Sequence, residues 1–125
     1  MSPLEIAALV VGGGVGAGMR YLVDGIVMRG RTGAFPLGIL VVNVIGAFLL
    51  GLLTGLGPLV APAAAVILGS GALGGFTTFS TVSVETVLLA REGRRPWAWT
   101  NLLGSAVLAV AAAAVGLMLG GVLPR

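Results

Sequence analysis

The polar residues that could do chemistry are concentrated in one stretch of the chain. Residues 69–81 read Gly-Ser-Gly-Ala-Leu-Gly-Gly-Phe-Thr-Thr-Phe-Ser-Thr, which places four glycines and five hydroxyl residues inside a long apolar segment. Because these are poor helix formers, we expect a helix to unwind here. Unwound backbone leaves carbonyl groups free to coordinate a cation. The alternative is an intact helix whose Ser and Thr side chains bond back to its own carbonyls.

Other polar side chains occur singly within apolar sequence. Asn43 is flanked by valines, and Asn101 and Ser105 are one helical turn apart. An amide in an apolar setting needs hydrogen-bond partners. These side chains therefore either hold helices together or line a path for a polar solute.

Three ionisable residues also interrupt apolar sequence. Arg20 and Asp24 are four residues apart, so they could form a local ion pair, or Arg20 could draw anions into a vestibule. Glu85 follows Ser80 by five residues. Ionisable groups inside a membrane segment are candidates for function.

Several classes of site are excluded by residue type. The chain has no cysteine and no histidine. Disulfides, Cys or His zinc sites and Ser-His or Cys-His catalytic pairs are therefore excluded. No nucleophile and base or metal set is evident, so we do not expect an enzyme.

The composition requires a lipid environment. Hydrophobic residues make up 58% of 125 residues and charged residues 9%, and the mean hydropathy is +1.14. Soluble domains are about 45–50% apolar and about 25% charged. The sparse charges give a net charge of +3 and form no basic face, so no nucleic-acid partner is expected. The composition predicts an integral membrane protein.

Four apolar stretches can each cross a bilayer as a helix, at about residues 4–27, 36–56, 63–89 and 97–123. They predict an all-α membrane protein, with residues 1–125 forming a single four-helix transmembrane domain. The third helix is expected to be broken in the middle of the membrane. Glu5 and the lack of an early basic residue argue against a cleavable signal peptide.

Charge is distributed unequally between the two ends of this bundle. The first and third connectors, at residues 28–35 and 90–96, hold five arginines, whereas the opposite side holds only Arg125. By the positive-inside rule these two connectors are cytoplasmic and both termini lie outside. Trp97 and Trp99, beside Arg94 and Arg95, indicate a membrane interface.

The chain contains 22 glycines, and many are spaced four apart. Such pairs let helix backbones approach closely in lipid. The pairs either pack the bundle internally or form a dimer interface. We expect a dimer, because four short helices enclose little room for a pathway of their own. The pairs are Gly12/Gly16, Gly14/Gly18, Gly51/Gly55, Gly71/Gly75 and Gly116/Gly120.

Three segments together resemble the Fluc/CrcB family of small fluoride channels. They are residues 13–21 (Gly-Gly-Val-Gly-Ala-Gly-Met-Arg-Tyr), 42–48 (Val-Asn-Val-Ile-Gly-Ala-Phe) and 74–81 (Gly-Gly-Phe-Thr-Thr-Phe-Ser-Thr). The resemblance covers nearly the whole chain. It implies an antiparallel dimer with two narrow pores in the inner (plasma) membrane. Fluoride would leave the cytoplasm passively through them, which gives fluoride resistance.

The resemblance also implies roles for particular residues. A structural Na⁺ at the centre of the dimer would be held by the backbone carbonyls of Gly74 and Thr77. Asn43 would be the pore asparagine, and Phe79 would present its ring edge to the ion. The remaining implied residues are Thr81, Glu85 and Ser105 on a polar track along the pore, and Arg20 in the vestibule.

The chain departs from the family pattern in two ways. Val82 stands where the family usually has a second phenylalanine. The one-sided arginines also contrast with members that insert in both orientations. We therefore hypothesise either a homodimer with one altered pore contact or one half of a heterodimer with a homologous subunit.

Two other functions fit a small membrane protein. A four-helix drug/proton antiporter would need a carboxylate in mid-membrane, for which Glu85 is the candidate, but no aromatic cage for a cationic drug is evident. A non-transporting assembly subunit would use its glycines only for packing. Packing alone does not require a destabilised third helix.

Overall fold

The computed structural model describes residues 1–31 and 34–123, and in these residues it has helices and no strands. Four spans are long and apolar enough to cross a membrane: Pro3–Val27, Leu37–Leu59, Pro62–Arg91 and Arg95–Gly121. The predicted all-α membrane fold with four spans is confirmed. The elements are α1 (Pro3–Val27), α2 (Leu37–Leu56), η1 (Gly57–Leu59), α3 (Pro62–Val66), η2 (Ile67–Leu73), α4 (Gly74–Phe76), α5 (Ser80–Arg91) and α6 (Arg95–Gly121).

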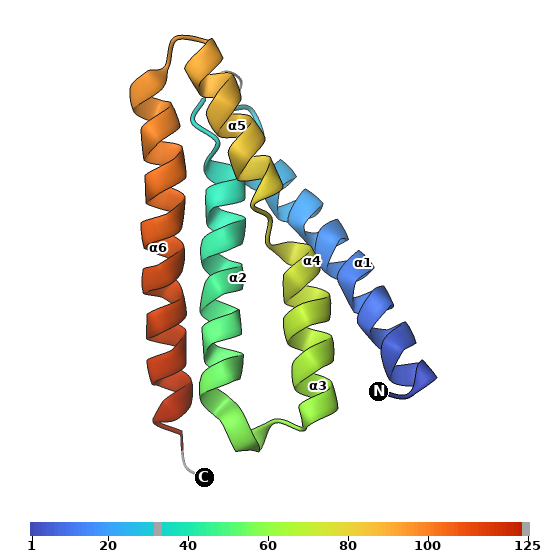
Figure 1. Ribbon diagram of the computed structural model, residues 1–125. Helices are drawn as coiled ribbons and strands as arrows, with labels where there is room; N and C mark the ends of the chain where they lie inside the picture. Colours follow the sequence, from blue (N-terminus) through green and yellow to red (C-terminus); the bar gives the residue numbers. More distant parts are fainter. Residues whose placement is uncertain (32–33, 124–125) are drawn as a thin grey trace.

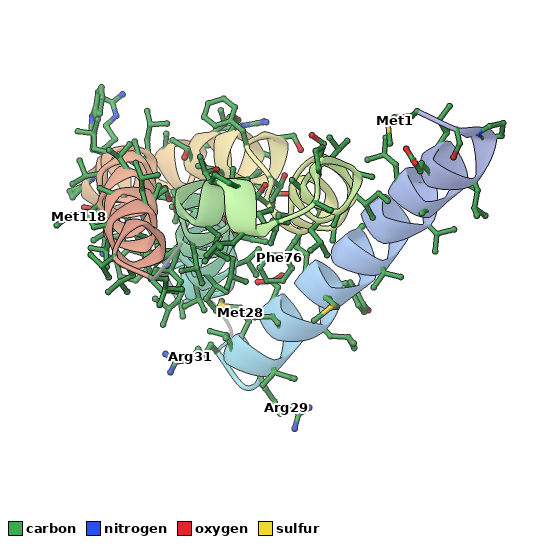
Figure 2. All side chains as sticks on the ribbon, turned by 90° about the horizontal axis from the view of Figure 1, so that it is seen from below. Met1, Met28, Arg29, Arg31, Phe76 and Met118 are labelled. Atoms are coloured by element: carbon green, nitrogen blue, oxygen red, sulfur yellow. The ribbon has the colours of Figure 1, made fainter. Side chains whose placement is uncertain are left out.

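The spans run alternately up and down (Figure 1). The α1–α2 and α5–α6 connections lie at one end, and the start of α1, the α2–α3 connection and the end of α6 lie at the other. α2 stands between α6 and the α3–α4 half of the third span, and α1 crosses that half obliquely. The two arginine-containing connectors therefore share one end of the bundle, where Arg29 and Arg31 extend outward (Figure 2).

The turns between the spans depend on glycine. Gly30, Gly57 and Gly93 follow α1, α2 and α5, with φ angles of +74°, +51° and +81°. Side chains rarely tolerate this left-handed conformation, so glycine allows the chain to leave a helix sharply. At the start of α1 the Ser2 hydroxyl accepts a hydrogen bond from the Glu5 N–H at 3.2 Å, as an N-cap does.

α2 and α6 pack backbone against backbone. Gly51 lies on the carbonyl of Ala113, and Gly116 lies on the carbonyl of Phe48. A Cβ atom at either glycine would overlap the facing backbone, and Gly55 and Gly120 are equally close to the opposite helix. These glycines therefore set the approach of the two helices, as small residues do in membranes.

α1 packs in the same way on the first half of the third span. Gly16 lies on the carbonyl of Ala72, and Gly75 lies on the carbonyl of Gly13. By contrast, a Cβ at Gly14 or Gly18 would meet nothing within 4 Å. Four of the five predicted pairs therefore serve packing within the chain, and the Gly14/Gly18 pair faces outward.

The interior is small and mostly apolar, with Thr78, Asn101 and Ser105 as its buried polar side chains among the described residues. Val42 and Val82 are the largest fully buried side chains among the described residues, and Phe76 is 7% exposed. Figure 2 shows Phe76 pointing inward between α1 and the rest of the bundle. Its ring and Thr77 lie against Gly46 of α2, where a Cβ would overlap the Thr77 methyl group.

Candidate functional site

The third span is interrupted between Phe76 and Ser80. α4 ends at Phe76 and α5 begins at Ser80, and Thr77 is extended, with φ −80° and ψ 155°. Upstream of α4, η2 is a π-helix over Ile67–Leu73. π-helical turns often occur at functional sites.

Asn43 of α2 pairs with the backbone of Thr78 in this interruption. Its Nδ2 donates to the Thr78 carbonyl at 2.7 Å, and its Oδ1 accepts from the Thr78 N–H at 2.9 Å. One amide thus satisfies both backbone polar groups of Thr78, which lack helical partners at the interruption. Asn43 therefore joins two helices.

The pairing has a consequence for the carbonyls of Gly74 and Thr77. In a continuous α-helix these would accept from the N–H groups four residues later, at Thr78 and Thr81. Here the Thr78 N–H donates to Asn43 Oδ1, and the Thr81 N–H donates to the Thr78 hydroxyl at 3.2 Å. Within the described residues, no hydrogen bond to either carbonyl is formed.

The Thr78 side chain starts the second half of the span. Phe79 is the N-cap residue of α5, and the Thr78 hydroxyl just before it accepts from the Thr81 N–H in the first turn of that helix. The same oxygen lies 3.1 Å from Ser80 Oγ and donates to Thr81 Oγ1 at 3.3 Å. The hydroxyls of this run are thereby tied to one another at the start of α5.

A cavity of about 490 Å³ opens beside the interruption, between α2, the third span and α6. It brings together five of the residues predicted from the sequence: Asn43, Gly74, Thr77, Phe79 and Ser105. None of the described residues that line it is charged. An ion in this cavity would therefore meet only neutral dipoles.

Ser105 is the most exceptional of these residues. It is 6% exposed, and its hydroxyl has no hydrogen-bond partner among the described residues. Several other hydroxyls in the helices bond to the carbonyl four residues earlier, as Thr54 does to Leu50 at 2.8 Å and Thr100 does to Pro96 at 2.8 Å. A buried hydroxyl without a partner costs free energy unless something else binds it.

The two phenylalanines of the third span have opposite environments. Phe76 is 7% exposed, whereas Phe79 is 73% exposed. Phe79 lines the cavity but contributes little to packing within the chain. Its ring is therefore available to an ion or to another chain.

Val82 occupies the position of the usual second phenylalanine. It is 2% exposed and lines the same cavity. Its carbonyl accepts from Thr86 Oγ1 at 2.7 Å and from Asn101 Nδ2 at 3.4 Å. The smaller side chain is thus part of the interior of the chain.

Three predicted site residues lie outside the cavity lining: Arg20, Thr81 and Glu85. The Thr81 hydroxyl accepts a hydrogen bond from the Thr78 hydroxyl. Glu85 is half-buried, and its Oε1 is buried without a partner among the described residues. Arg20 is half-buried on α1, and the Asp24 carboxylate one turn later lies against Gly38 of α2.

Two structural residues were not recognised from the sequence. Thr78 provides both the backbone partner of Asn43 and a hydroxyl that accepts from an N–H in the first turn of α5. Its spacing of three residues from Thr81 fits a cap and its target and could have indicated this role. Thr86 accepts from Asn101 Nδ2 at 3.0 Å and so joins α5 to α6, for which the sequence carries no signal.

The comparisons with known proteins agree with these features. The family described as "CrcB-like protein, Camphor Resistance (CrcB)" matches residues 7–117. A protein of Leifsonia xyli subsp. xyli, named fluoride-specific ion channel FluC 1, is 43% identical over 97% of this chain and 90% of its own length. A protein of the same name from Rubrobacter xylanophilus is 42% identical over 96% of each chain. The fluoride-specific ion channel FluC of Ruminiclostridium cellulolyticum is 38% identical over 98% of this chain and 93% of its own. This chain therefore belongs to the CrcB-like family.

Proposed function

We propose that this chain is the subunit of a fluoride-selective channel that lets cytoplasmic fluoride leave passively, down its electrochemical gradient. The observation that carries the proposal is the Ser105 hydroxyl, which has no hydrogen-bond partner in the described part of the chain and is buried in a cavity shared with Asn43 and Phe79. The relatives named fluoride-specific ion channels support the choice of ion.

The cavity has suitable chemistry for a small anion. The Ser105 hydroxyl can donate to it, and Asn43 retains a second N–H beyond the one given to Thr78. The edge of the Phe79 ring carries partial positive charge. Conduction requires binding that is weak enough to release the ion. Neutral donors bind an anion weakly enough for release, whereas a charged arginine would hold it.

A second copy is proposed to complete the pathway. The cavity is open, and Phe79 is 73% exposed beside it. In an antiparallel homodimer, or a heterodimer with a homologous subunit, Phe79 of one chain would approach the cavity of the other. The outward Gly14/Gly18 pair offers a further surface for close contact.

A structural Na⁺ is proposed between the two copies. The Gly74 and Thr77 carbonyls accept no hydrogen bond within the described residues, and oxygen atoms from unwound helices are suitable ligands for this hard cation. Two chains would supply four such oxygens. The ion would fix the interruption and need take no part in conduction.

The antiporter is the less favoured alternative. Proton-coupled exchange requires a carboxylate on the transport path. Glu85 does not line the cavity, and no described lining residue is acidic.

We propose that the chain is a multi-pass protein of the plasma membrane with residues 28–35 and 90–96 in the cytoplasm, since these two arginine-containing connectors lie at the same end of the bundle.

The test is efflux from liposomes that contain the purified chain alone, with fluoride and chloride measured in parallel. Fluoride efflux without chloride efflux is expected. Equal passage of chloride would contradict selectivity, and efflux that requires an opposing proton gradient would favour exchange. Robust fluoride efflux from this chain alone would exclude an obligate heterodimer.

A further inference from the structure

A second cavity, separate from the candidate pathway, lies between the end of α5 and the start of α6. Its volume is about 380 Å³, and it is lined by Thr86, Ala90, Arg95, Ala98, Trp99 and Leu102. Of these, only Leu102 also lines the first cavity. The site proposed for fluoride therefore does not account for it.

The interior of this cavity is suited to hydrocarbon. Its one hydroxyl, that of Thr86, already donates to the Val82 carbonyl at 2.7 Å and accepts from Asn101 at 3.0 Å. The alanines, Leu102 and the Trp99 ring provide the other uncharged walls. A polar solute would find no free hydroxyl there, whereas an alkyl chain would contact apolar atoms.

One edge of the cavity is cationic. Arg95 is the first residue of α6, and the first turn of that helix contains no acidic residue. Arg91 ends α5, and Glu92 is the single acidic residue of the connector. Arg94 packs over the Trp97 ring, 4.8 Å from its centroid, and Trp97 meets Phe35 edge to face at 5.8 Å. Arg95 is thus the arginine that belongs to the cavity.

The cavity lies where a membrane span meets water. α5 and α6 are joined at an end of the bundle (Figure 1), and Trp99 is 62% exposed. Exposed tryptophans at span ends sit at the level of the lipid headgroups. Basic pockets between transmembrane helices bind anionic headgroups.

We propose that this cavity binds an anionic phospholipid, with its phosphate at Arg95 and an acyl chain along Ala90, Ala98 and Leu102. The apolar walls and the cationic edge match the two ends of such a molecule. Free phosphate would use only the edge. The proposal does not depend on which ion the chain conducts, because its test measures lipid alone.

The test is native mass spectrometry of the purified chain after exposure to equal amounts of phosphatidylglycerol and phosphatidylcholine with the same acyl chains. The wild type should retain phosphatidylglycerol in preference. Arg95→Gln should reduce that retention about fivefold, the effect of one basic residue at an anionic membrane. Ala90→Leu should reduce it as well, because the larger side chain fills the cavity with the charge unchanged. Ala90 is exposed, so this variant does not overpack the core.

The matched control is Arg29→Gln, which removes the same charge from the other connector at the same end. It should retain lipid as the wild type does. An equal loss in this control, full retention in Ala90→Leu, or no preference in the wild type would overturn the proposal. Displacement of the lipid by inorganic phosphate would also overturn it. If Arg95→Gln fails to fold, Arg95→Lys should fold and retain more lipid than Ala90→Leu.

Discussion

Asn43 holds Thr78 by both of its backbone groups, from a position 35 residues earlier in the chain. The amide thereby takes the place of two helical hydrogen bonds at the interruption of the third span. One N–H of Asn43 is left for another acceptor. The structural role suggested by its position in α2 and the proposed contact with an ion are therefore compatible in one side chain.

Replacing Asn43 by Asp should impair both roles. The carboxylate can still accept from the Thr78 N–H, but it cannot donate to the Thr78 carbonyl, and its charge repels an anion in the cavity. Loss of one hydrogen bond should lower the free energy of unfolding by about 1 kcal/mol or more. Fluoride efflux should fall at least about tenfold, which requires a barrier only about 1.4 kcal/mol higher. Liposome efflux and thermal unfolding in detergent measure the two effects, and wild-type efflux would leave Asn43 with a packing role only.

Phe79→Ile should reduce efflux while leaving the fold intact. Phe79 is 73% exposed, so its removal costs little packing within the chain, but the isoleucine has no aromatic edge to offer an anion. Efflux should drop about tenfold or more, the effect of losing about 1.4 kcal/mol of stabilisation at the barrier. The matched control is Phe76→Ile, which should instead destabilise the chain by about 1–3 kcal/mol, because the smaller side chain leaves a gap in the interior. Unchanged efflux in Phe79→Ile would remove the ring from the pathway.

Ser105→Ala separates function from stability. Its hydroxyl has no partner among the described residues, so removing it should leave the unfolding temperature equal to or above that of the wild type. Losing one neutral donor worth about 1 kcal/mol should slow fluoride efflux about fivefold. Thr86→Val is the control, since the Thr86 hydroxyl is fully bonded and its loss should lower stability. If Ser105→Ala destabilised the chain, the hydroxyl would have a structural partner.

Gly16→Ala tests the close approach of α1 to the third span. The added methyl group would overlap the Ala72 carbonyl, and overpacking of this kind costs about 1–3 kcal/mol. Gly18 lies two residues later, on the outward face of α1. Gly18→Ala should therefore stabilise the isolated chain by about 0.5–1 kcal/mol, because alanine favours helix. Unfolding in detergent distinguishes them, and equal effects would contradict the assigned contact.

Val82→Phe tests whether this chain has room for the phenylalanine that the family usually has at this position. Val82 is 2% exposed, so phenylalanine should cost about 1–3 kcal/mol of stability. Val82→Ile should cost less, because it adds one carbon. A Phe variant as stable as the wild type would show that the open cavity beside Val82 accepts the ring.

The four spans could be predicted because a transmembrane helix needs little more than length and apolar composition. The last span shows how closely the helix bounds can be predicted: the sequence predicts residues 97–123, and α6 covers Arg95–Gly121. Gly51, Gly55, Gly116 and Gly120 were correctly identified as close-contact positions, but their spacing alone could not distinguish packing within the chain from a dimer interface. Only the facing backbone, at Ala113 and Phe48, makes that distinction.

The site was less predictable because its contacts join distant parts of the chain. The pairing of Asn43 with Thr78 depends on the axial position of α2 relative to the third span. Local conformational preferences of the chain do not determine that position. Ser105 could not be recognised as unpartnered, since a serine in a helix ordinarily bonds to the carbonyl of the preceding turn. Ser83 does so, to Phe79 at 3.0 Å.

The glycine contacts between α2 and α6 also limit how the sequence can change in length. One inserted residue rotates everything after it by about 100° around the helix axis. An insertion between Ala113 and Gly116 would therefore turn a side chain toward Phe48 and Leu52, where only hydrogen atoms now fit. In this contact region α2 and α6 therefore tolerate neither gain nor loss of a single residue. Changes in length should be confined to the connectors.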